Sequence, residues 1–152
     1  DKFPSFAGFA EANIIDIYGS SNLSEALHLE VQEFRSVIIR NNSKGNFKLE
    51  PLPLEAQYAP INGIVCHDFD NDGYQDIILA GNKYEAEVET SRADAGTGLL
   101  LRGSKNGTFE AVSSRESGFF VPGNIKAVEK VVTVTGVLVL AGENNRPLLV
   151  FK

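Results

Sequence analysis

The sequence predicts a mainly β fold of β-propeller-type antiparallel blades, forming a partial propeller, with a short N-terminal helical segment. Two observations carry this prediction. Short apolar runs separated by turn residues recur along most of the chain, and similar runs return after about 60 residues. Self-similarity at such a period is typical of propellers and other repeated β-units.

Residues 1–26 are predicted to form the helical segment. Apolar side chains recur with helical spacing between residues 5 and 18, which indicates one helix there. A glycine- and serine-rich break follows, after which Ser21 or Asn22 can cap a second short helix that ends near Ala26.

Residues 27–152 are predicted to form the β-blade region, which begins with a half-buried strand at 27–32, where apolar and polar residues alternate. A complete blade is predicted over about 63–113, with strands near 63–68, 76–81, 98–103 and 107–113. A partial blade over about 125–152 adds strands near 125–130, 136–141 and 147–151. Such a partial propeller leaves sheet edges uncovered, so we expect either a longer parent chain or a homo-oligomer.

Two similar turns mark the repeat. Gly45 ends one turn and Gly107 ends another about 62 residues later, and each glycine is followed two residues on by a phenylalanine. Asn106 followed by Gly107 is also a strong hairpin signal, because both residues tolerate a positive φ. These turns predict that the last two strands of each unit form a hairpin.

The segment 68–76 is predicted to bind a cation, because carboxylates alternate along it and a tightly curled loop directs them inward. Gly73 permits the left-handed turn that closes such a loop. Hard oxygen ligands in this number suit Ca²⁺, whereas Mg²⁺ requires a stricter octahedron. The predicted metal ligands are four carboxylates and one backbone carbonyl: Asp68, Asp70, Asp72, Asp76 and Tyr74.

Two other interpretations of this loop are weaker. An EF-hand requires glutamate at its twelfth position, where this chain has Leu79. An EF-hand loop is also flanked by helices, whereas this loop is flanked by apolar runs of the β type. A metal-free acidic turn would leave four aspartates repelling one another. The corresponding segment 129–136 lacks alternating carboxylates, so we expect a single, structural ion.

Composition excludes several functional classes. The net charge of -6 argues against a nucleic-acid partner or an anionic membrane surface. No apolar run reaches the roughly 20 residues that a membrane helix needs, so no membrane insertion is expected. The single cysteine, Cys66, excludes an internal disulfide and is expected to be buried. No nucleophile elbow or phosphate loop is present, so we expect no catalytic residues and no enzymatic activity.

Three further features keep two interpretations each. The long connection between Gly81 and Gly98 is either an extended hairpin with an Arg92–Asp94 ion pair or a ligand-contacting loop. The segment 117–123 either fills the core between blades or places aromatic rings in a binding groove. His67 is either an ordinary strand residue or a group that orients a carboxylate of the loop.

The chain resembles the FG-GAP/VCBS repeat proteins, whose blades share the calcium loop of the integrin α-subunit propeller. The loop 68–76, the strand 77–81 that follows it and the turn 107–109 carry the likeness. More narrowly, the stretches 51–57, 92–96 and 117–123 are similar to the C-terminal region of bacterial FG-GAP proteins with ASPIC/UnbV-type domains. The resemblance implies a seven-bladed propeller in the intact protein, bound calcium, and an extracellular, periplasmic or cell-surface location.

Together these features predict a non-catalytic, calcium-binding module for recognition, adhesion or scaffolding, with structural calcium and an unknown protein or carbohydrate ligand. An alternative is an accessory domain of a larger carbohydrate-active enzyme, which a cleft with paired Asp or Glu residues would favour. An exposed aromatic platform, for instance Phe119 or Tyr84, would instead support sugar binding without hydrolysis. A third possibility is an oligomerisation element.

Overall fold

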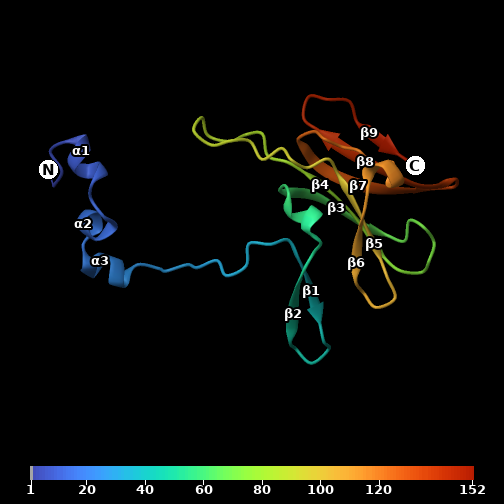
Figure 1. Ribbon diagram of the computed structural model, residues 1–152, viewed down its shortest axis with the longest axis horizontal. Helices are drawn as coiled ribbons and strands as arrows, with labels where there is room; N and C mark the ends of the chain where they lie inside the picture. Colours follow the sequence, from blue (N-terminus) through green and yellow to red (C-terminus); the bar gives the residue numbers. More distant parts are fainter. Residues whose placement is uncertain (1) are drawn as a thin grey trace. The chain divides into compact units, whose positions relative to one another are not determined.

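The computed structural model describes residues 2–152 and shows a mainly β protein with antiparallel sheets and a few short helices (Figure 1). Contacts within the chain define two compact units, of which the first ends at Phe34 and the second spans Arg35–Lys152. Among the described residues, no helix is long and apolar enough to cross a membrane.

The first unit contains three short helices: α1 (Phe6–Ala10), α2 (Ile14–Tyr18) and α3 (Ser20–Glu25). The prediction of one helix over residues 5–18 is therefore wrong. Asn13 interrupts it, because its side chain accepts from the Asp16 amide at 2.9 Å while the Asp16 carboxylate accepts from the Asn13 amide at 3.1 Å. This reciprocal capping box starts a new helix. The predicted caps of the last helix are also wrong, since Gly19, with φ of 82°, takes that position.

The strand predicted at 27–32 is not formed. Leu27, Leu29 and Val31 are exposed, at 83%, 80% and 62% of their surface, and no strand in the described part of the chain pairs with them. Alternation makes a segment suitable for a half-buried sheet face, but a strand also requires a partner for its backbone groups.

The second unit contains three antiparallel sheets. The first is a hairpin of β1 (Val37–Asn41) and β2 (Phe47–Pro51). The second has the order β3 (Ile61–His67), β4 (Asp76–Gly81), β5 (Leu99–Gly103) and β6 (Phe109–Val112). The third has the order β7 (Ile125–Thr133), β8 (Gly136–Glu143) and β9 (Leu149–Phe151). The strands predicted within residues 63–113 and 125–152 are thereby confirmed as sheets.

Strand β4 lies at the centre of the packing. All six of its residues are buried, because successive side chains of a strand point to opposite faces and both faces of the sheet are covered at this strand. Ile78 and Ala80 join a core shared with β7 and β8, whereas Ile77 and Leu79 join a second core with the short helix η1 (Leu54–Gln57) and Ile38 of β1.

Strand β3 is an edge strand with one covered face. Val65 is buried at 4% exposure, whereas Ile64 and Cys66 point outward and are exposed. The predicted burial of Cys66 is therefore wrong. The same alternation that buries Val65 places the cysteine on the open face.

The segment 117–123 fills the core, as the first of its two interpretations predicted. It follows the short helix α4 (Ser114–Ser117), and Phe119 and Val121 are buried at 4% and 1% exposure. The Phe119 ring packs edge-on against Phe151 of β9, with centroids 4.8 Å apart. Only Phe120 of this segment's aromatic pair is exposed.

Asn82 anchors the long connection between β4 and β5. This residue has a φ of 88° and is 1% exposed. Its side-chain amide donates to the Gly96, Pro122 and Gly123 carbonyls at 2.8, 3.3 and 3.0 Å, and its oxygen accepts from the Gly96 amide at 2.9 Å. A single buried side chain thus fixes the base of the connection and satisfies all of its own polar atoms.

Beyond Asn82 the connection continues as an extended hairpin. Lys83 pairs with Ala93 in an antiparallel bridge. Arg92 Nε lies 3.9 Å from Asp94 Oδ2, which confirms the predicted ion pair. The Arg92 guanidinium also lies 5.1 Å from the centre of the Tyr84 ring.

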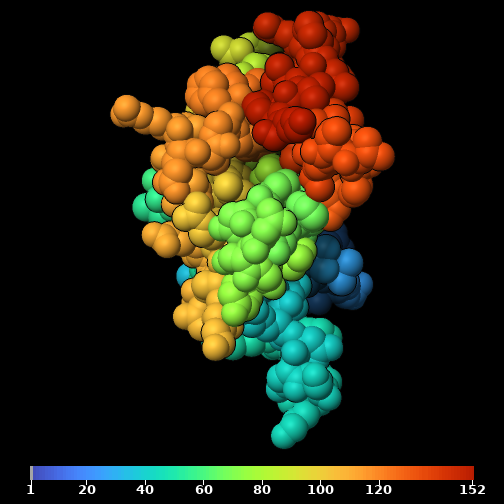
Figure 2. Space-filling view, turned by 90° about the vertical axis from the view of Figure 1, so that its right-hand side faces the viewer, coloured from blue at the N-terminus to red at the C-terminus, as the bar shows by residue number. Residues whose placement is uncertain are grey.

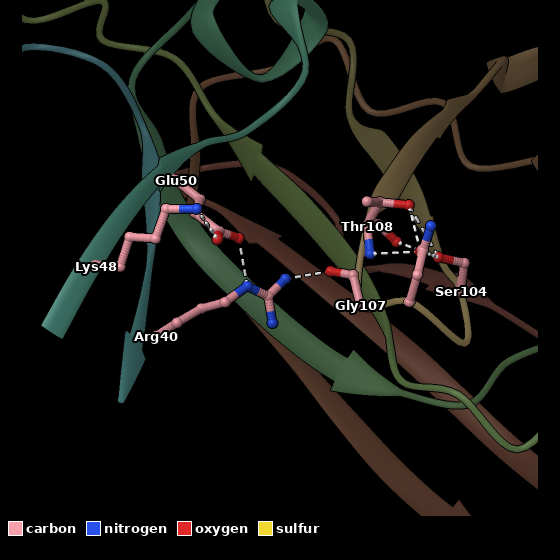
Figure 3. A network of polar contacts seen from close by, with 7 residues as sticks. Arg40, Lys48, Glu50, Ser104, Gly107 and Thr108 are labelled. Carbon is pink, nitrogen blue, oxygen red and sulfur yellow. Dashed lines mark hydrogen bonds and ion pairs between the residues drawn. The ribbon is translucent and has the colours of Figure 1, made fainter. Parts of the chain in front are cut away.

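Arg40 joins the first hairpin to the turn between β5 and β6 (Figure 3). Its guanidinium donates to the Gly107 carbonyl and pairs with Glu50, which Lys48 also contacts at 3.0 Å. Hydrogen bonds from Arg40 and then Lys48 lower the pKa of Glu50 below its ordinary value. The hairpin of β5 and β6 predicted from Asn106 and Gly107 is present, and of these two residues only Gly107 has a positive φ, of 78°.

Candidate metal centre

The candidate site is the loop of residues 68–75, which connects β3 to β4. The last residue of β3, His67, pairs with the first of β4, Asp76, so the two ends of the loop lie side by side. Figure 2 shows this loop, in green, on the surface of the molecule. A hairpin therefore closes the loop and brings residues at its start close to the residue at its end.

Three carboxylates converge in this loop. Oxygen atoms of Asp68, Asp70 and Asp76 all lie within 4.8 Å of one another. Asp76 is buried, Asp68 is half-buried and Asp70 is more exposed, so the cluster extends from the sheet to the surface. Such a set of hard oxygen donors is suited to a divalent cation such as Ca²⁺.

Backbone amides hold the outer carboxylates in place. The Asp72 amide donates to Asp68 Oδ1 and Asp70 Oδ1 at 3.1 and 3.2 Å, and the Gly73 amide donates to Asp68 Oδ2 at 2.9 Å. The loop turns through positive φ values at Asn71 (59°) and Gly73 (89°). The role predicted for Gly73 is confirmed, and Asn71 adds a second left-handed position that asparagine tolerates.

Asp76 anchors the site in the sheet. It is 1% exposed, and its two oxygens accept from different segments: Oδ1 from the Gly103 amide and Oδ2 from the Phe69 amide, both at 2.8 Å. A buried carboxylate requires such donors because its charge is costly to remove from water. Gly103 is required here, since a Cβ at that position would lie 2.1 Å from the Gln75 carbonyl oxygen.

Two predicted ligands lie outside the cluster of three. The Asp72 carboxylate accepts from the Tyr74 amide at 2.8 Å and does not converge with the other three carboxylates. The roles of Asp72 and the Tyr74 carbonyl as ligands stay predictions. The His67 ring packs edge-on against Phe69, 5.2 Å between centroids, and among the described residues it makes no hydrogen bond to a carboxylate.

Arg102 is a neighbour of the site that the sequence did not reveal. Its Nε lies 3.2 Å from Asp70 Oδ2, and its Nη2 lies 3.1 Å from Glu116 Oε1 on α4. The bond to Glu116, followed by the charges of Glu116, Asp70 and Asp76, raises the pKa of Arg102 above its ordinary value. Gly103 was not identified from the sequence either. One available signal was that glycine ends two neighbouring strands, β4 at Gly81 and β5 at Gly103.

The residues present fit a calcium ion. An ionised carboxylate offers about four lone-pair sites, and the hydrogen bonds described above use two at Asp68 and two at Asp76. Acceptor capacity therefore remains at each carboxylate. Three negative charges meet here, and in the described part of the chain Arg102 forms an ion pair with one of them, Asp70, so a divalent ion would balance the site.

Comparisons with known proteins give no assignment. No protein-family model matches the chain, and neither the curated proteins nor the solved structures contain a match. The geometry of the loop and its sheet is thus the basis on which function is argued.

Proposed function

We propose that this protein is a non-catalytic calcium-binding module of the FG-GAP/VCBS kind, which serves recognition, adhesion or scaffolding. One observation carries the proposal: three carboxylates meet within 4.8 Å in a loop that joins two neighbouring strands of a sheet. The bound ion is structural, because the carboxylates belong to the loop and to the first residue of β4 rather than to a cavity for a substrate.

The site stabilises the sheet through Asp76. This residue contacts the start of the loop through Phe69 and the end of β5 through Gly103. A cation shared with Asp68 and Asp70 would cancel the mutual repulsion of the three carboxylates and so favour the folded loop. Ligand binding to the native state alone contributes about 2.7 kcal/mol at a free concentration 100 times Kd.

The arrangement of the sheets supports the propeller-type assembly within a longer parent chain or a homo-oligomer. The four-stranded sheet has a core on each face, shared with the neighbouring elements on either side. The outer faces of those neighbours remain apolar: Ile39 and Leu49, paired across β1 and β2, are 63% and 50% exposed, and Val150 of β9 is 56% exposed. Further blades would cover such faces.

An extracellular, periplasmic or cell-surface location agrees with this function. Extracellular calcium modules work with dissociation constants of about 10⁻⁴ to 10⁻³ M, which a partly exposed site with few buried ligands can reach. The unknown protein or carbohydrate ligand would contact the loops that project beyond the sheets, and the exposed tip of the connection at 87–90 is one candidate.

The alternative function is an accessory domain of a larger carbohydrate-active enzyme, which would require a cleft with paired carboxylates. Sugar binding without hydrolysis would require an exposed aromatic platform, but Phe119 is buried at 4% exposure and the Tyr84 ring is contacted by Arg92. The recognition or scaffold function does not depend on such a platform.

Thermal unfolding of the full chain, in EDTA and then in millimolar Ca²⁺ with Mg²⁺ for comparison, tests the proposal. At saturating Ca²⁺ we expect Tm to rise by about 5 to 10 °C, which corresponds to about 2.7 kcal/mol for a chain of this size. Asp70→Ala and Asp72→Ala should remove the rise, whereas Asp94→Ala, outside the loop, should keep it. A wild-type Tm that is the same in EDTA and Ca²⁺ would contradict the proposal.

A further inference from the structure

We infer that the guanidinium of Arg102 competes with the cation for Asp70, an inference that rests on the proposed calcium site. The guanidinium balances the charge of Asp70 when the loop holds no cation, and it thereby lowers the affinity of the loop for Ca²⁺. Glu116 sets the strength of this competition by sharing the guanidinium. The affinity of the site is thus determined by two residues that are not its ligands.

The position of Arg102 is fixed by the sheet rather than by the loop. In the strand register of β5 and β6, the backbone of Arg102 lies opposite that of Glu110. The next residue, Gly103, donates its amide to Asp76 at 2.8 Å. Two successive residues of β5 therefore serve two carboxylates of the site. Gly103 supports the buried Asp76 through the backbone, and Arg102 reaches the outer Asp70 with its side chain, Nε to Oδ2, at 3.2 Å.

The direction of the effect follows from the charges. Without a cation, Asp68, Asp70 and Asp76 repel one another, and the positive charge of Arg102 offsets part of that repulsion. A divalent ion placed among the same carboxylates would then lie close to a like charge. Arg102 consequently stabilises the cation-free loop more than the loaded one.

The size of the effect is limited by solvent. The side chains of Arg102 and Asp70 are 42% and 39% exposed, so water and salt screen their interaction with each other and with an ion. We therefore expect removal of the guanidinium to change affinity by about three- to tenfold, rather than to create or abolish binding.

Glu116 acts in the opposite direction. Its carboxylate holds Arg102 Nη2 at 3.1 Å and neutralises part of the guanidinium charge. The helix that carries it, α4, is capped by Gly118 and leads directly into the buried Phe119, so Glu116 sits on an anchored element. Without Glu116, more of the Arg102 charge would act on Asp70 and the affinity for Ca²⁺ would fall.

Calorimetric titration of CaCl₂ into the EDTA-dialysed full chain at low salt tests this inference. Arg102→Gln should bind Ca²⁺ about three- to tenfold more tightly and unfold at a lower temperature in EDTA. Glu116→Gln should bind about two- to threefold more weakly, and this loss should disappear when Arg102→Gln is also present. Arg115→Gln makes the same charge change on α4 and should bind Ca²⁺ with the affinity of the wild type. The affinity of Arg102→Lys, which keeps the charge, should lie closer to the wild-type value than that of Arg102→Gln.

The outcomes separate the inference from the function on which it rests. If the wild type binds Ca²⁺ and a folded Arg102→Gln binds it equally or more weakly, the competition is refuted while the site stands. An equal gain in Arg115→Gln would assign the effect to net charge and would also refute it. If the wild type binds no Ca²⁺, the proposed function fails first and the competition fails with it.

Discussion

Two hairpins of this protein share a plan and differ at their tips. In β3–β4 and in β7–β8, the register shifts near the open end, between Ile61 and Gly63 in one and between Ile125 and Ala127 in the other. The first hairpin stops pairing at His67 and releases residues 68–75 as the acidic loop. The second continues pairing to Thr133 and Gly136 and closes in a tight turn.

The two tips satisfy their backbone groups in different ways. In the second, Thr133 Oγ1 donates to the Gly136 carbonyl at 2.7 Å and accepts from the Thr135 amide at 3.2 Å, with no charged group. In the first, carboxylates accept the amides of Phe69, Asp72 and Gly73. The comparison teaches that the hairpin itself needs no ion. Under the proposed function, the acidic loop makes one tip respond to cations, whereas the other tip, which is closed by threonine hydroxyls, does not respond.

The largest expected effect concerns the anchor of the acidic tip. Asp76→Ala should lower the free energy of unfolding in EDTA by about 2 to 5 kcal/mol, because it leaves the Phe69 and Gly103 amides without their acceptor. Urea unfolding measures this loss. Thr133→Ala, the matched change in the other tip, should cost only about 0.5 to 1.5 kcal/mol. Equal losses in both variants would show that Asp76 is no special anchor.

A smaller effect is expected from calcium on amide exchange. Adding Ca²⁺ at about 100 times Kd should slow exchange at Asp72, Gly73 and Gly103 by up to about 100-fold, because these amides bind the carboxylates that hold the ion. Hydrogen exchange followed by NMR resolves the positions. The Thr135 amide in the other tip serves as internal control and should not change. Uniform slowing over both tips would mean that calcium acts on the whole fold instead.

The smallest effect concerns the start of β7, where Lys126 forms an ordinary ion pair with Glu85. Lys126 and Asn124 donate to Glu85 and lower its pKa from 4.5 to about 2. A carboxyl group with a lowered pKa contributes stability above its unfolded pKa and loses it as the pH falls through the folded value. The stability difference between wild type and Glu85→Gln should therefore be present at pH 6 and shrink between about pH 4.5 and 2.

This last difference is small because Glu85 is exposed and solvent screens the pair. Chemical unfolding at several pH values measures it, and Glu89→Gln, an exposed carboxylate of the same connection, is the control. A difference that grows as the pH falls would contradict the assignment. A pH-independent difference would show that packing, rather than charge, explains the loss.

The sequence predicted what depends on neighbours along the chain. The alternating aspartates, the glycine of the loop and the apolar runs of β3 and β4 are local signals. The structure places the strands and the glycine as expected and brings three of the four aspartates together, while Asp72 lies outside the cluster. The contacts of Arg102 and Gly103 with the loop join segments far apart in the sequence, and only the register of β4 and β5 brings them together. The strand expected at 27–32 failed for the same reason, since a strand depends on a partner that its own sequence does not specify.

The side chain of Asn82 makes the stretch 83–95 free to change in sequence while the rest of the unit keeps its fold. Because it fixes Gly96, Pro122 and Gly123 from a buried position, both cores are complete without any residue of the stretch 83–95. Substitutions, insertions or a different ligand preference can therefore accumulate in that stretch at little cost to folding. Asn82 itself, which is 1% exposed and makes four hydrogen bonds through its side chain, should not tolerate such changes.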